Sequence, residues 1–108
     1  MDRISKVNKH IQRVLGEVMQ KHAEIPGGLL VTISKVETAP NLRTALVWLY
    51  INPSGNGERI LKLLQDQIYE LQGYFNEAVR LHPLPRLSFK EDHGAEYAQH
   101  ISSIVDTL

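Results

Sequence analysis

Hydrophobic residues recur at helical spacing near the start of the chain and predict a helix over residues 3–22. The apolar stripe consists of Ile4, Val7, Ile11, Val14, Leu15 and Val18, which follow one another at intervals that place them on one helix face. We expect this helix to end before Ile25-Pro-Gly-Gly28, because proline removes a backbone donor and glycine interrupts regular structure.

Two runs of β-branched and apolar residues come next, Leu29 to Glu37 and Arg43 to Asn52, and predict two strands. Pro40 and Asn41 between them favour a tight turn, so we expect an antiparallel hairpin. The second strand alternates between two apolar faces: Ala45, Val47, Leu49 and Ile51 on one side, and Leu46, Trp48 and Tyr50 on the other. The second set is interpreted as an interface or as a stripe that a later segment covers.

The second half of the chain predicts one long helix and a third strand. Ile60, Leu64, Ile68, Leu71, Phe75 and Val79 lie three or four residues apart, which favours a helix from Glu58 to about Leu81. Gly73 inside it costs about 1 kcal/mol relative to alanine and indicates a kink or a tolerated weakness.

Proline residues 83 and 85 end that helix, and Arg86 to Lys90 then alternates as a short strand. Apolar residues between positions 97 and 108 predict a last amphipathic helix. The order α-β-β-α-β-α over residues 1–108 is typical of a single α+β domain with two layers, in which helices cover one face of a three-stranded sheet.

Composition excludes several classes of protein. There are no cysteine residues, so disulfides and thiolate chemistry are absent. The longest apolar run is far shorter than the roughly 20 residues that span a membrane, and bases are spread through the first turns, unlike a signal peptide. We therefore expect a cytoplasmic protein without a membrane partner.

The net charge is zero, with twelve Lys/Arg and twelve Asp/Glu, which at first disfavours a nucleic-acid partner. Resolved along the chain, residues 1–52 have seven bases and four acids, a net charge of +3, whereas residues 53–108 have five bases and eight acids, a net charge of −3. The predicted first helix gathers basic side chains on one flank: Arg3, Lys6, Lys9, His10 and Arg13. A flank of this kind can contact RNA phosphates.

Motifs for catalysis are missing. There is no nucleophile elbow, P-loop or GxGxxG segment, and the five histidine residues do not have metal-ligand spacing. We therefore expect no enzyme activity, no metal, no cofactor and no small-molecule substrate.

The predicted order resembles the type II KH fold, but no pair of glycine residues makes the GxxG loop of KH domains. Such a chain is similar to the ribosome-binding factor A family, bacterial factors that mature the small ribosomal subunit. The segments that carry the resemblance are Arg3-Ile-Ser-Lys-Val7, Gly28 to Glu37, Pro40-Asn-Leu-Arg43 with Ala45 and Val47, and Pro85 with Leu87, Phe89 and Asp92. The family's A-x-G interruption of the second helix is placed at Leu71-Gln72-Gly73.

The resemblance implies a monomeric, non-catalytic factor that binds the free or immature 30S subunit near the 5′-terminal helix of 16S rRNA. It also implies a role in late rRNA processing, often for growth in the cold. Further candidate RNA contacts are Lys35 and Arg43 near the hairpin turn, Gly73 at the expected kink, and Arg80 and Arg86 beside the proline-rich loop. Two alternatives stay open: a protein-interaction or dimerisation module that uses Leu46, Trp48 and Tyr50, and a generic RNA-binding KH-like domain.

Overall fold

The computed structural model describes residues 2–94, so the helix expected over residues 97–108 lies outside the described part of the chain. The elements are α1 (Arg3–His22), β1 (Leu30–Thr38), β2 (Thr44–Asn52), α2 (Gly57–Asp66), α3 (Ile68–Ala78) and β3 (Arg86–Glu91). The predicted first helix is confirmed to the residue, and each predicted strand is confirmed to within one residue at either end.

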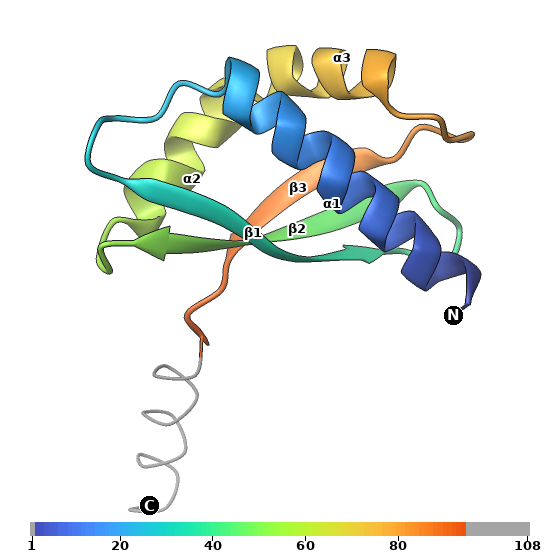
Figure 1. Ribbon diagram of the computed structural model, residues 1–108, viewed down its shortest axis with the longest axis horizontal. Helices are drawn as coiled ribbons and strands as arrows, with labels where there is room; N and C mark the ends of the chain where they lie inside the picture. The colour runs from blue at the N-terminus through green and yellow to red at the C-terminus, as the bar shows by residue number, and fades with distance from the viewer. Residues whose placement is uncertain (1, 95–108) are drawn as a thin grey trace, which may run out of the picture.

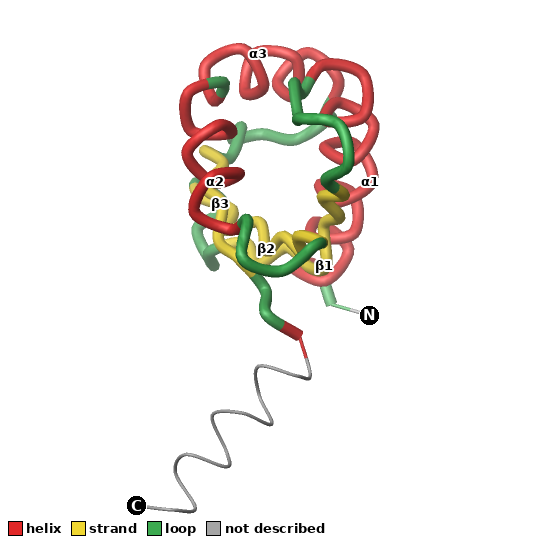
Figure 2. The backbone as a smooth tube through the Cα atoms, turned by 90° about the vertical axis from the view of Figure 1, so that its left-hand side faces the viewer, coloured by secondary structure: helices red, strands yellow, loops and turns green. Residues whose placement is uncertain are grey.

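The three strands form one sheet in the order β1-β2-β3, with β1 and β2 antiparallel and β2 and β3 parallel. Helices α1, α2 and α3 lie over one face of this sheet (Figure 1), and the view along the strands shows the two layers separately (Figure 2). The expected two-layer α+β arrangement is confirmed. We call the side of the sheet that faces away from α1, α2 and α3 the open sheet face.

Helix α1 begins at a side-chain cap. The Asp2 carboxylate accepts a hydrogen bond of 2.7 Å from the backbone N–H of Ser5, which satisfies one of the unpaired donors of the first turn. Hydrogen bonds from Ser5 lower the pKa of Asp2, because they stabilise the ionised form. The cap explains why the helix starts where the apolar stripe starts.

The core lies between the sheet and the helices. The inward residues of β2, Ala45, Val47, Leu49 and Ile51, are at most 4% exposed, as the alternation predicts. They pack with buried residues of all three helices, including Leu15, Leu64 and Phe75. Apolar side chains repeated on the inner face of the sheet and on the facing sides of the helices therefore hold the two layers together.

Strand β1 contains a bulge that the alternation of the sequence did not predict. Ile33 pairs with Leu49 and Lys35 with Trp48, which leaves Ser34 without a partner on β2. One extra residue shifts the alternation of side chains by one position. The bulge therefore lets both Ile33 and Val36 join the core, and it gives Lys35 the position beside Trp48.

The second long helix is interrupted, but the place expected for the interruption was wrong. It falls at Gln67, between α2 and α3, and Gly73 lies inside α3 without a break. The side chain of Gln67 bonds the backbone of Glu24, in the loop after α1, through both its oxygen and its nitrogen. This contact with a distant loop favours a turn at Gln67.

Amide side chains from the helices also bond the outer strands of the sheet. On β1, Asn8 accepts from the backbone N–H of Thr38 at 2.9 Å, and the amide nitrogen of Gln12 donates to the carbonyl oxygen of Ile33 at 3.1 Å. At the opposite edge of the sheet, formed by β3, Gln72 accepts from the N–H of Leu87 at 2.9 Å and donates to the carbonyl oxygen of Pro85 at 3.0 Å. These bonds fix α1 and α3 relative to the strands beside them.

Candidate nucleic-acid interface

The basic side chains predicted on α1 do share its exposed side. Arg3, Lys6, Lys9 and Arg13 are all exposed. Arg13 has an ion pair with Glu17 at 3.7 Å, and both side chains are about 60% exposed (63% and 60%), so the pair contributes little to folding stability. The flank therefore presents cations that a phosphate can reach.

His10 connects this flank to the far end of α3. A guanidinium nitrogen of Arg13 lies 3.3 Å from His10 Nδ1, and the backbone N–H of Arg80 donates to Nε2 at 3.4 Å. The half-buried imidazole thus places Arg80, which follows α3, beside the α1 flank. Sequence spacing could not show this, because the two residues are 70 positions apart.

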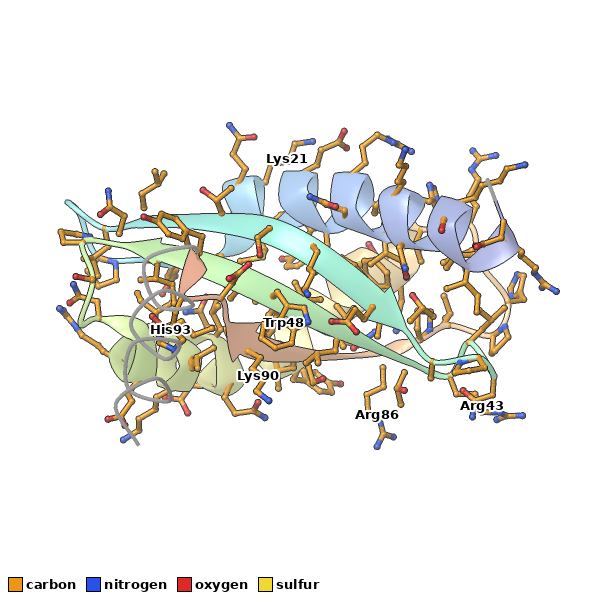
Figure 3. The ribbon with its side chains drawn as sticks, turned by 90° about the horizontal axis from the view of Figure 1, so that it is seen from below. Lys21, Arg43, Trp48, Arg86, Lys90 and His93 are labelled. Atoms are coloured by element: carbon orange, nitrogen blue, oxygen red, sulfur yellow. The ribbon has the colours of Figure 1, made fainter. Side chains whose placement is uncertain are left out.

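Arg43 and Arg86 are neighbours at the same end of the sheet. The backbone N–H of Arg86 donates to the carbonyl oxygen of Arg43 at 2.9 Å, where β2 and β3 begin. Figure 3 shows both side chains toward that end, with Lys21 toward the other end of α1.

The start of α1, the turn between β1 and β2, and the loop between α3 and β3 all lie at one end of the molecule (Figure 1). We call this region, with the flank that leads to it, the basic end. Its basic residues are Arg3, Lys6, Lys9, Arg13, Arg43, Arg80 and Arg86. Segments that are separate in the sequence therefore contribute to one cationic surface.

Lys35 does not belong to the basic end, although the sequence placed it near the hairpin turn. It lies on the open sheet face beside Trp48, with Nζ 4.8 Å from the centre of the indole ring. Lys90 on β3 approaches the same ring at 5.4 Å, and Figure 3 shows Trp48 and Lys90 close together. The indole N–H donates to the carboxylate of Glu37 at 2.6 Å, which fixes the ring between the two lysines.

Lys90 was not among the contact residues predicted from the sequence. The alternation of β3 puts it on the same side as Arg86, but only the parallel register, which pairs Lys90 with Trp48, shows what it contacts. The other residues of the predicted outer stripe also lie on the open sheet face: Leu46 is half-buried, and Tyr50 is 46% exposed.

Gly73 is an exposed residue on the outside of α3. A methyl group at this position would meet no atom within 4 Å, so close packing does not require glycine there. The residue lines an open groove of about 640 Å³ together with Tyr69, Glu70, Glu77 and Arg86. Two carboxylates in that groove disfavour a phosphate backbone, in contrast to the basic end.

Residues 2–94 contain neither a group of side chains that could bind a metal ion nor a helix that could span a membrane. In this range, no three His, Asp or Glu side chains form a group that could hold a metal ion, and every buried side-chain nitrogen or oxygen has a hydrogen-bond partner. Within the same residues, no helix is long and apolar enough to cross a bilayer.

Known proteins are similar to this chain in both sequence and fold. The family model of ribosome-binding factor A matches residues 3–105. Ribosome-binding factor A of Bdellovibrio bacteriovorus is 28% identical over 107 residues, which cover 98% of this chain and 80% of that protein. The crystal structure of ribosome-binding factor A from Thermus thermophilus superimposes with a TM-score of 0.72 at 21% identity, over 83% of this chain and 97% of that one.

A homology model of the Thermus thermophilus protein, fitted into a cryo-EM map of a complex between the 30S subunit and ribosome-binding factor A, superimposes with a TM-score of 0.67 at 24% identity. It covers 81% of this chain and 92% of that one. These likenesses show a KH-like fold. Because the family model extends over nearly the whole sequence, the chain belongs to the ribosome-binding factor A family.

Proposed function

We propose that this protein is a non-catalytic assembly factor that binds the free or immature 30S subunit as a monomer. Its contact is 16S rRNA near the 5′-terminal helix, and its role is to assist late processing and folding of that RNA. The contact surface is the basic end, which binds phosphates and does not read base sequence.

The observation that carries the proposal is the gathering of bases from separate segments. His10 joins the α1 flank to Arg80, and the bond between Arg86 and Arg43 joins the starts of two strands. A surface of this kind supplies charge for RNA binding even though the whole chain has no net charge. Membership of the family supports the ribosome as the partner.

The test is co-sedimentation with free 30S subunits in a sucrose gradient. The variant combines Arg3→Glu with Lys6→Glu, and the matched control combines Lys21→Glu with Lys62→Glu, two exposed lysines away from the basic end. Acidic side chains in the first turn of α1 interact favourably with the helix dipole, so the variant keeps its fold. Circular dichroism checks that both proteins remain folded.

We expect the wild type and the control to be retained on free 30S subunits and to be absent from 70S ribosomes. The variant should no longer be retained on free 30S subunits. If the variant binds as well as the control, the basic end is not the contact. If the wild type does not bind free 30S subunits, the proposed function itself is wrong.

A further inference from the structure

The open sheet face carries a second arrangement of cations and aromatic rings, distinct from the basic end. Lys35, Trp48 and Lys90 form a row across the three strands, because Trp48 pairs with Lys35 on one side and with Lys90 on the other. The two ammonium groups lie 4.8 and 5.4 Å from the indole centre. The described helices all cover the opposite face of the sheet (Figure 2).

Trp48 and Tyr50 provide two aromatic rings on this face. They are two residues apart on β2 and therefore about 7 Å apart along the strand. Tyr50 is 46% exposed, and the bond from the indole N–H to Glu37 holds Trp48 in place. Sheets that present aromatic residues in this way bind unpaired RNA by stacking its bases on the rings.

Charge on the open sheet face favours an anionic partner. Lys90 points to this side from β3 and has no carboxylate within ion-pair distance among residues 2–94. Two carboxylates on this side are engaged: Glu37 accepts from Trp48 and pairs with Lys35 at 3.5 Å, and Asp92 accepts from the Ser34 hydroxyl at 2.7 Å. The lysines that flank the rings can therefore meet incoming phosphates.

We propose that the open sheet face is a binding site for a single-stranded RNA segment. Bases stack on Trp48 and Tyr50, while Lys35 and Lys90 contact the phosphates on either side. An exposed interaction between an ammonium group and an aromatic ring is weak, so a phosphate can draw the lysines away from the indole and free its face for a base. The inference rests on the proposed function in taking RNA as the partner, and it adds a second surface that recognises unpaired nucleotides.

Trp48 is the single tryptophan of the chain, so its fluorescence reports on this site alone. The probe is a fluorescein-labelled dodecamer of uridylate, which has no secondary structure. Binding is measured by anisotropy of the label, and occupancy of the open sheet face by quenching of Trp48. A polyglutamate peptide at the same ionic strength tests for an acidic protein segment instead.

The first variant combines Lys35→Gln with Lys90→Gln, which removes both charges and retains the indole. Trp48→Leu and Tyr50→Leu remove one ring each and retain apolar bulk. The control combines Arg59→Gln with Lys62→Gln, two exposed bases of α2, so that its change in net charge equals that of the lysine variant.

We expect the dodecamer to quench Trp48 and each site variant to raise the Kd at least about tenfold, with the control within about twofold of wild type. Loss of two phosphate contacts should also reduce the slope of log K against log salt by about 1.4 for a single strand. Binding without quenching, an unchanged Kd in the lysine variant, or equal quenching by polyglutamate overturns the proposal. Because no ribosome is present, a negative result here leaves the 30S test of the basic end unaffected, and the reverse also holds.

Discussion

The side chain of Gln67 binds the backbone of Glu24 on both sides of its amide group. Its oxygen accepts from the Glu24 N–H at 2.8 Å, and its nitrogen donates to the Glu24 carbonyl oxygen at 2.9 Å. The amide group thus satisfies both backbone hydrogen-bonding groups of Glu24. Gln67 is also the residue that separates α2 from α3. The break between the helices and the course of the loop after α1 are one structural unit.

Gln67→Ala should lower the free energy of unfolding by about 1–2 kcal/mol, because two partly exposed hydrogen bonds are lost. Gln65→Ala, an exposed change near the end of α2, should change it by less than about 0.5 kcal/mol. Urea denaturation followed by circular dichroism measures both. Equal values for the two variants would show that the Glu24 contact does not stabilise the fold.

Gly73→Ala should stabilise the protein by about 1 kcal/mol, because the residue is helical and its new methyl group meets open space. Gly28→Ala is the control with the opposite sign. Gly28 has a φ of 85°, where a Cβ costs about 1–2 kcal/mol. Thermal unfolding compares them, and a destabilised Gly73→Ala protein would indicate that the helix needs flexibility there.

Ser34→Ala should raise the pKa of Asp92 toward its ordinary value. The Ser34 hydroxyl is the largest cause of the lowered pKa, followed by the backbone N–H of Gly94. A carboxyl group whose pKa is lower in the folded state stabilises the fold above the unfolded pKa of about 3.9, and this contribution is lost as the pH falls through the folded value. The serine variant should therefore lose less stability on acidification over that range.

The measurement is an NMR titration of the carboxyl carbons, together with unfolding at several acidic pH values. Asp2 serves as the internal control, because its pKa is lowered by Ser5 and should not respond to Ser34. An unchanged pKa for Asp92 in the variant would contradict the assigned hydrogen bond.

Binding to free 30S subunits should weaken steeply as salt rises, because phosphate contacts release counterions. Replacing Arg3 and Lys6 by glutamine should reduce the slope of log K against log salt by about 1.4–1.8, from the per-contact values for single and double strands. The same replacement at Lys21 and Lys62 should leave the slope unchanged. Sedimentation at a series of salt concentrations gives the slopes, and parallel lines for all three proteins would place the contact elsewhere.

Local patterns predicted those elements that local interactions determine. Residues 3–22 could be assigned from the apolar stripe alone, and the side-chain cap at Asp2 that fixes the start of the helix became visible only in the structure. Both strands of the hairpin were recognisable from β-branched runs. The sequence contains one weak sign of the bulge at Ser34: the apolar residues Ile33 and Val36 are three residues apart and cannot share one face of a regular strand.

Long-range contacts determine what the sequence could not predict. Apolar spacing continues through Leu64, Ile68 and Leu71, so nothing local indicates a break at Gln67. The kink was predicted at Gly73 instead, because glycine is a poor helix former. The basic end was predicted in part: the α1 flank follows from helical spacing, whereas the approach of Arg80 depends on His10. The position of Lys90 beside Trp48 depends on the parallel register.

The amide bonds that Asn8, Gln12 and Gln72 make to the outer strands have a consequence for behaviour at high concentration. A sheet with exposed outer strands can add further strands from other molecules, which is a common route to aggregation. Here both outer strands have backbone groups already occupied by helix side chains. The described helices therefore leave one broad face of the sheet uncovered, while their side chains occupy edge groups that a strand of another molecule would otherwise bind.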